Sequence, residues 1–182
     1  MPKNMANYLT IGRVLMIPVF LVLMYVDFPG SRYWALAVYI VACLTDFADG
    51  YIARHYHQIS DFGKFMDPLA DKCLVMAALC CFVEQGDMLA WILAVVLVRE
   101  FAVSGMRLVA AERGRVIAAA WSGKIKTAST MVCLCIMMLL NEPWVPVPRT
   151  INTLCIVVIV GTTLYSGIEY FAKNIDIFKD AD

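Results

Sequence analysis

Charged residues are scarce in this sequence, and long polar segments are missing from it. Asp, Glu, Lys and Arg together make up 16% of the 182 residues, whereas apolar residues make up 62%. Soluble domains contain about 45–50% apolar residues, so this composition excludes an ordinary water-soluble protein. The length allows about six membrane-spanning helices with short connections, so we expect residues 1–182 to form a single integral membrane domain.

Several common motifs are also absent. The seven cysteines lie in apolar runs without a CxxC pair, so they predict neither a disulfide framework nor a metal site. No small-x-small cleavage pattern follows the polar amino terminus, and the first apolar run is therefore expected to stay in the protein as a membrane span. The sequence has no internal repeat, no low-complexity tract and no basic stripe, and nucleic-acid binding is not expected.

Breaks in the apolar pattern predict an all-α bundle of six transmembrane helices with a short interfacial segment at the amino terminus. The predicted helices cover residues 8–27, 33–54, 66–84, 88–110, 119–140 and 151–172. Tight turns at 29–31, 84–87 and 141–150 would lie on one side of the membrane, and the segments 55–65 and 111–118 on the other. Most Lys and Arg residues fall on this second side, with both termini, which predicts that it faces the cytoplasm.

Four aspartates fall on two consecutive predicted helices, at spacings that put each pair on one helix face. Asp46 and Asp49 are three residues apart, and Asp67 and Asp71 are four apart. Because the two helices are antiparallel, their acidic faces can meet. Two ionised carboxylates about 5 Å apart repel by roughly 3 kcal/mol at an effective dielectric near 20, so the four need bound cations or shared protons. Hard oxygen ligands at this spacing suit Mg²⁺ or Mn²⁺.

The residues around the aspartates favour a metal site over a proton pathway. Gly50 removes a side chain beside the acidic face, and Arg54 follows one turn later as a partner for a phosphate. A proton pathway needs neither residue, and the helices beyond Asp46 and Asp71 are apolar. A cation or proton transport protein is nevertheless kept as an alternative from a different class. Ion pairing with nearby lysines would explain one carboxylate but not four.

Eight residues at fixed spacing in this region resemble the complete signature of the CDP-alcohol phosphotransferase family: Asp46-x2-Asp49-Gly50-x2-Ala53-Arg54-x8-Gly63-x3-Asp67-x3-Asp71. The resemblance implies that the four aspartates hold divalent metal, as two ions of Mg²⁺ or Mn²⁺. It also implies that Asp71 acts as a ligand or general base, which makes it the candidate catalytic residue. The part of the motif expected to bind CDP-diacylglycerol comprises Asp49, Gly50, Ala53, Arg54 and Gly63.

Polar residues outside the motif add weaker candidates. Asn7, Thr10 and Arg13 share a helix face at spacings of three and could help to bind the nucleotide of CDP-diacylglycerol or, alternatively, glycerol phosphate. An amphipathic entry into the first span is the alternative interpretation. His55 and His57 lie between the two motif helices, where an interfacial polar turn is favoured over a metal site.

Basic residues in the second half of the chain indicate that the substrate that accepts the transferred group, the acceptor, is anionic. Arg99 and Glu100 lie near the end of the fourth apolar helix, where a charged side chain costs free energy. Their presence there favours a functional role. Pairing of Arg99 with Glu100 or with a motif aspartate is the alternative, although adjacent helical residues do not face each other. For the lysines of the fifth helix, snorkelling to the membrane surface is the alternative. The candidates to bind a phosphate group on the acceptor are Arg99, Arg107, Lys124, Lys126 and Thr127.

The segments NYLTIGR, REF, GMRL and SGKIKT are similar to the pattern of bacterial phosphatidylglycerophosphate synthases, whose acceptor is sn-glycerol 3-phosphate. The resemblance implies transfer of a phosphatidyl group from CDP-diacylglycerol to this acceptor, with release of CMP. It also implies a homodimer in the bacterial cytoplasmic (inner) membrane, in contact with membrane lipid and with its active site facing the cytoplasm. Inositol phosphate or serine as the acceptor is the alternative within the same chemistry.

Overall fold

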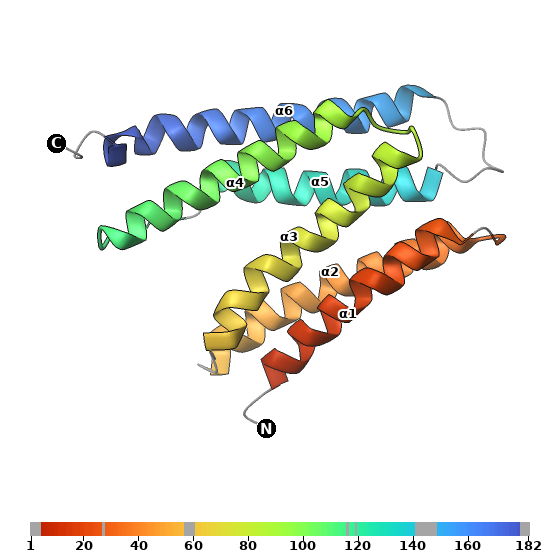
Figure 1. Ribbon diagram of the computed structural model, residues 1–182, viewed down its shortest axis with the longest axis horizontal. Helices are drawn as coiled ribbons and strands as arrows, with labels where there is room; N and C mark the ends of the chain where they lie inside the picture. The colour runs from red at the N-terminus through yellow and green to blue at the C-terminus, as the bar shows by residue number, and fades with distance from the viewer. Residues whose placement is uncertain are drawn as a thin grey trace. The chain divides into compact units, whose positions relative to one another are not determined.

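The structure is a computed structural model that describes residues 5–26, 28–56, 61–115, 117–118, 120–140 and 149–178. Side chains are described for residues 11–26, 28–45, 72–115, 117–118, 120–140 and 150–176. Among the described residues there are helices and turns but no strand, which confirms the prediction of an all-α protein (Figure 1). The elements are α1 (Met5–Tyr25), α2 (Ser31–Tyr56), α3 (Asp61–Glu84), α4 (Ala90–Glu112), α5 (Trp121–Leu140), α6 (Arg149–Asn174) and the 3₁₀ helix η1 (Ile175–Phe178).

Most helix boundaries lie close to the predicted ones, and α3 is the exception. It begins at Asp61 rather than at residue 66, and α2 continues to Tyr56 rather than ending at residue 54. The prediction followed the apolar runs, whereas helical hydrogen bonding continues beyond them into polar sequence. His55, which was expected in the connecting turn, therefore lies in the last turn of α2, while His57 lies outside the described residues.

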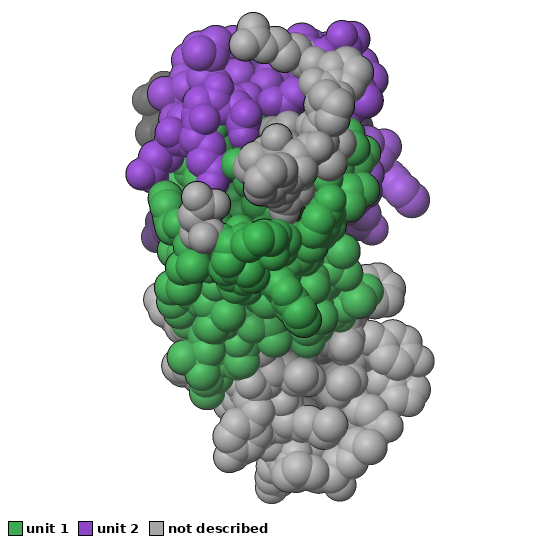
Figure 2. Space-filling model, turned by 90° about the vertical axis from the view of Figure 1, so that its right-hand side faces the viewer, with its two compact units in different colours: residues 1–82, 135–147 green, residues 83–134, 148–182 purple. Residues whose placement is uncertain are grey.

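The chain divides into two compact units, which Figure 2 shows in different colours. The first contains residues 1–82 and 135–147, and within it α1 packs along α2. The turn between these helices uses Gly30, whose φ of 85° is unfavourable for other residues. The buried rings of Phe20 and Tyr39 hold the two helices together, with their centroids 5.9 Å apart. This confirms the predicted tight turn at residues 29–31.

The second unit contains residues 83–134 and 148–182, and in it α4 packs against α6. Val103, Met106 and Ala110 of α4 form a buried apolar cluster with Tyr170 of α6. The α3–α4 turn is joined to the start of α6, because the Asn152 side-chain amide donates to the backbone carbonyl of residue 87 at 3.1 Å. These contacts fix α4 and α6 side by side and so position the polar residues between them.

Two described helices are long and apolar enough to cross a membrane. They are Trp121–Leu140, with a mean hydropathy of 1.5, and Thr150–Asn174, with a mean hydropathy of 1.8. The apolar segments Ile11–Tyr25 and Ser31–Thr45 are shorter. Large apolar side chains lie on the surface, including Phe101, which is 72% exposed, and lipid is the natural environment for such a surface. These features favour the predicted membrane setting, while the predicted count of six spans stays a prediction.

All seven cysteines are free. Cys81, Cys133 and Cys155 are buried among apolar side chains, as small hydrophobic residues commonly are. The absence of a disulfide framework stays a prediction.

Candidate functional site

The aspartate motif lies on α2 and α3, as the spacing predicted. Asp46 and Asp49 belong to α2, and Asp67 and Asp71 belong to α3. Since both segments are helical, the residues of each pair share a helix face. The side chains of all four lie outside the described residues, as do those of Gly50, Ala53, Arg54 and Gly63. The metal centre and the CDP-diacylglycerol contacts therefore stay predictions.

Arg13 is the one member of the amino-terminal candidate set whose side chain is described. It lies on α1 and is only 1% exposed, whereas the side chains of Asn7 and Thr10 lie outside the described residues. An amphipathic entry into a membrane helix would leave a basic residue at the surface. The burial of Arg13 argues against that alternative for this residue.

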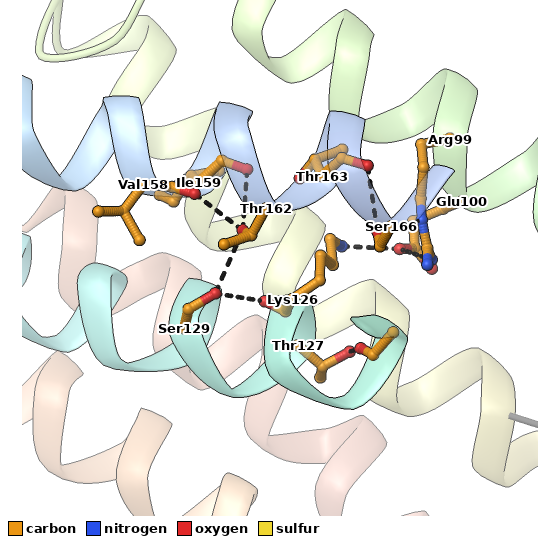
Figure 3. A network of polar contacts seen from close by, with 11 residues as sticks. Arg99, Glu100, Lys126, Thr127, Ser129, Val158, Ile159, Thr162, Thr163 and Ser166 are labelled. Atoms are coloured by element: carbon orange, nitrogen blue, oxygen red, sulfur yellow. Dashed lines mark hydrogen bonds and ion pairs between the residues drawn. The ribbon is translucent and has the colours of Figure 1, made fainter. Parts of the chain in front are cut away.

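A cluster of charged side chains lies in the second unit, where α4 and α5 supply two cations and one anion (Figure 3). The Glu100 Oε1 atom accepts hydrogen bonds from Arg99 Nη1 at 3.0 Å and from Lys126 Nζ at 2.7 Å. Lys126 is 3% exposed, so its ammonium group does not snorkel to the surface. We refer to Arg99, Glu100 and Lys126 as the charged triad.

Arg99 and Glu100 form an ion pair although they are adjacent in the sequence. Adjacent residues on a helix project in different directions, and this had counted against their pairing. The long Arg99 side chain nevertheless folds back to reach its neighbour. The alternative of pairing with Glu100 is thus realised in the structure, and the triad retains one net positive charge because two cations share one carboxylate.

The α6 helix supplies two partners to the α4 arginines that sequence reasoning did not identify. Arg99 Nε donates to the Ser166 hydroxyl at 3.1 Å, as Figure 3 shows. Arg107 Nε donates to the Tyr170 hydroxyl at 3.1 Å, and its guanidinium lies 5.7 Å from the centre of that ring. Both partners are buried. Each arginine therefore donates its Nε–H to a hydroxyl group of α6, and the terminal amino groups of a guanidinium supply four further N–H donors.

The remaining candidates on α5 are arranged differently. Lys124 is exposed, and its Nζ lies 5.3 Å from the centre of the Trp121 ring. Since it is two residues from Lys126, the two ammonium groups project from nearly opposite faces of the helix. The Thr127 hydroxyl donates to the backbone carbonyl of Gly123 at 3.1 Å, within its own helix. The structure thus gathers Arg99 and Lys126 at Glu100 and places Lys124 on another face.

The charged triad defines what this part of the protein can do. Ionisable side chains are expensive inside apolar helices, and pairing offsets only part of that cost. Two mostly buried cations that share the Glu100 carboxylate in the described part of the chain can accept a further anion, and guanidinium and ammonium groups both bind phosphate. The fold and this cluster together describe an all-helical protein with two described helices apolar enough to cross a membrane, in which the charged triad is a candidate anion-binding site.

Comparison with known proteins shows which family the chain belongs to. The model of the CDP-alcohol phosphatidyltransferase family matches residues 3–165. The chain is 38% identical over 191 aligned residues to the CDP-diacylglycerol–glycerol-3-phosphate 3-phosphatidyltransferase of Bacillus subtilis, covering 98% of this chain and 99% of that protein. It is 36% identical over 174 residues to the protein of the same name from Pseudomonas fluorescens, covering 92% and 88%. The counterpart from Rickettsia bellii is 37% identical over 137 residues, covering 75% and 76%. This chain belongs to the CDP-alcohol phosphatidyltransferase family.

Proposed function

We propose that this chain transfers the phosphatidyl group of CDP-diacylglycerol to sn-glycerol 3-phosphate, giving phosphatidylglycerol phosphate and CMP. The observation that carries the proposal is the likeness to relatives named for this reaction over nearly the whole chain. The complete aspartate motif supports the family chemistry. The charged triad supports a phosphorylated acceptor, because its surplus positive charge suits a phosphate monoester better than a neutral alcohol.

The proposed reaction is a substitution at the phosphorus that carries the lipid. The glycerol hydroxyl oxygen forms a bond to this phosphorus, while the bond from the phosphorus to the bridging oxygen of the pyrophosphate breaks. CMP leaves with the bridging oxygen. The Asp71 carboxylate, as the candidate base, takes the proton of the attacking hydroxyl. Arg99 and Lys126 bind the phosphate of the acceptor, and Arg107, oriented by Tyr170, is the candidate for a further contact.

The aspartates suit divalent metal by the chemistry of their donors. Asp46, Asp49, Asp67 and Asp71 offer only carboxylate oxygens, from helical positions on α2 and α3, and such a set fits Mg²⁺ or Mn²⁺. We propose that these four residues hold two ions. When bound, such ions neutralise the pyrophosphate and stabilise the departing CMP. Gly50, Ala53, Arg54 and Gly63 are the proposed CDP-diacylglycerol contacts within the motif, with Asn7, Thr10 and Arg13 before it.

We also propose a topology for the protein. Six spans would leave both termini and the basic segments on the cytoplasmic side of a bacterial inner membrane, because Lys and Arg concentrate there. The long apolar helices α5 and α6 support the membrane setting. A homodimer is the proposed assembly, by analogy with the family.

The proposed reaction is tested with purified protein, CDP-diacylglycerol and radiolabelled sn-glycerol 3-phosphate. We expect label to enter the lipid fraction with stoichiometric release of CMP. Glycerol, serine and inositol phosphate offered as acceptors should give far lower rates. Equal or faster transfer to one of these three would reject glycerol 3-phosphate as the acceptor, and no transfer to any of the four acceptors would reject the proposed function.

Removal of divalent metal is expected to abolish this transfer. Excess EDTA should reduce the rate to background, and Mg²⁺ or Mn²⁺ added beyond the chelator should restore it, because the cations that the four carboxylates would hold would supply the positive charge that the pyrophosphate needs. The comparison is with the same protein treated with EDTA already saturated with Mg²⁺. Full activity in free EDTA would contradict the metal site.

A further inference from the structure

The Arg99 side chain passes close to two glycines that belong to different helices. A Cβ atom built on Gly167 of α6 would lie 3.3 Å from Arg99 Cγ, and one built on Gly123 of α5 would lie 3.5 Å from Arg99 Nη2. By contrast, Cβ atoms on Gly105 of α4 and Gly161 of α6 would have no neighbour within 4 Å. The two glycines beside Arg99 therefore leave space that this side chain uses.

The contacts of Arg99 extend along its whole length. Its Cγ lies against Gly167, its Nε donates to Ser166 at 3.1 Å, and its Nη1 donates to Glu100 at 3.0 Å. Gly167 follows Ser166 directly on α6, so one turn of this helix contacts the stem of the arginine and also accepts its hydrogen bond. The direction of the guanidinium is thus set by α6 and by the space that Gly167 leaves beside the stem.

We propose that Gly167 and Gly123 are positioning residues that set the place of the Arg99 guanidinium and thereby the affinity for the acceptor's phosphate. This inference rests on the proposed function. A Cβ at residue 167 would be closer to Arg99 than most carbon contacts are, so the neighbouring atoms would have to shift by a few tenths of an ångström, and it would meet the stem rather than the flexible end of the side chain. A displaced stem moves the whole guanidinium and misaligns its directional hydrogen bonds.

Substitutions of the two glycines are expected to differ in how strongly they displace Arg99. At Gly123 the nearest atom is the terminal Nη2 at 3.5 Å, an ordinary contact distance to a part of the side chain that can rotate. An added methyl group there should have little effect, whereas a larger side chain would push the guanidinium directly. Both glycines also lower the intrinsic stability of their helices by about 1 kcal/mol relative to alanine, which is consistent with a packing role for each.

The central experiment compares Gly167→Ala with Gly161→Ala, which lies on the same helix and has open space around it. We expect Gly167→Ala to raise the KM for sn-glycerol 3-phosphate about tenfold, because small displacements of a positioned group are costly. Its kcat and its KM for CDP-diacylglycerol should stay within about twofold of the parent. Gly161→Ala should leave all three parameters within about twofold, and Gly123→Ala should raise the KM for glycerol 3-phosphate less than threefold.

A double-mutant cycle separates positioning of Arg99 from a general packing effect. In an Arg99→Ala background, Gly167→Ala should add less than a twofold change, since the side chain that it displaces is gone. A full, additive change in that background would overturn the proposal. So would an unchanged KM for glycerol 3-phosphate in Gly167→Ala, or an equal rise of both KM values.

A second variant covers the case in which Gly167→Ala does not fold. Gly123→Val, in the first turn of α5, approaches the guanidinium from the other side and should raise the same KM at least about fivefold. An unchanged KM in this folded variant would then reject the proposal. Failure of the proposed function is distinct, because it would appear in the parent protein as no transfer to glycerol 3-phosphate at all.

Discussion

Asp71→Asn is expected to lower the rate of phosphatidyl transfer by roughly 10²–10⁴-fold. Asparagine keeps the size of the side chain but removes its charge and its ability to accept a proton, so both proposed roles, as base and as metal ligand, are lost. The rate is measured as incorporation of labelled sn-glycerol 3-phosphate by purified protein at saturating concentrations of both substrates. Thermal unfolding of the variant should match that of the parent, because the change conserves volume.

Asp176→Asn serves as the matched control for this change. Asp176 lies in η1 and forms an exposed ion pair with Arg115, at 2.6 Å between Oδ2 and Nη1. Exposed ion pairs contribute about 0–1 kcal/mol, so this variant should keep its rate within about twofold. Turnover within tenfold of the parent in a folded Asp71→Asn protein would reject the role assigned to Asp71.

Lys126→Met is expected to raise the KM for sn-glycerol 3-phosphate by roughly 10–100-fold, with a much smaller change in the KM for CDP-diacylglycerol. Methionine fills most of the volume of the buried lysine but cannot bind a phosphate. The change also removes one of the two cations that share Glu100, so the net charge of the triad falls from positive to zero. Steady-state kinetics with each substrate varied in turn measures both constants.

Substitutions of two further lysines serve as comparisons for Lys126→Met. Lys173→Met removes an exposed ammonium group that pairs with Glu169 on the same helix, and it should leave both KM values within about twofold. Lys124→Met tests the other predicted phosphate ligand of α5, for which we expect less than a threefold change because its ammonium group lies over Trp121. Equal effects at all three lysines would indicate a general charge effect and contradict a specific role for Lys126.

The sequence was sufficient to predict the helices, because apolar runs separated by Pro, Gly and polar turns are the dominant signal in a membrane protein. It was less reliable at the ends of α2 and α3. Asp61 and His55 are polar and lie outside the apolar runs, yet both are helical. Backbone hydrogen bonding decides where a helix ends, and a hydrophobicity pattern reports only which part of it is buried or in contact with lipid.

The charged triad could be predicted in part. Arg99 and Lys126 were identifiable because charged residues in apolar helices are rare. The Arg99–Glu100 pairing was only an alternative interpretation, since it depends on a side-chain conformation that spacing does not determine, and the contact of Lys126 with the same carboxylate was not predicted. Ser166 and Gly167 gave no signal at all, because small residues in an apolar helix are usually found at packing contacts. Only the structure shows that they lie against Arg99.

The Lys126–Glu100 ion pair also bears on how the chain enters the membrane. Lys126 lies in the second turn of one of the two described helices that are apolar enough to span a bilayer, where a lone charge is less costly than the about 2.5–3.5 kcal/mol of the helix centre but still disfavours insertion. The compensating carboxylate comes from α4, the preceding helix in the chain. We therefore expect α4 and α5 to insert into the membrane together, as a hairpin in which the ion pair has already formed. Insertion of α5 alone should be less favourable. The same contact that gathers the site's cations would then guide the assembly of the helices around it.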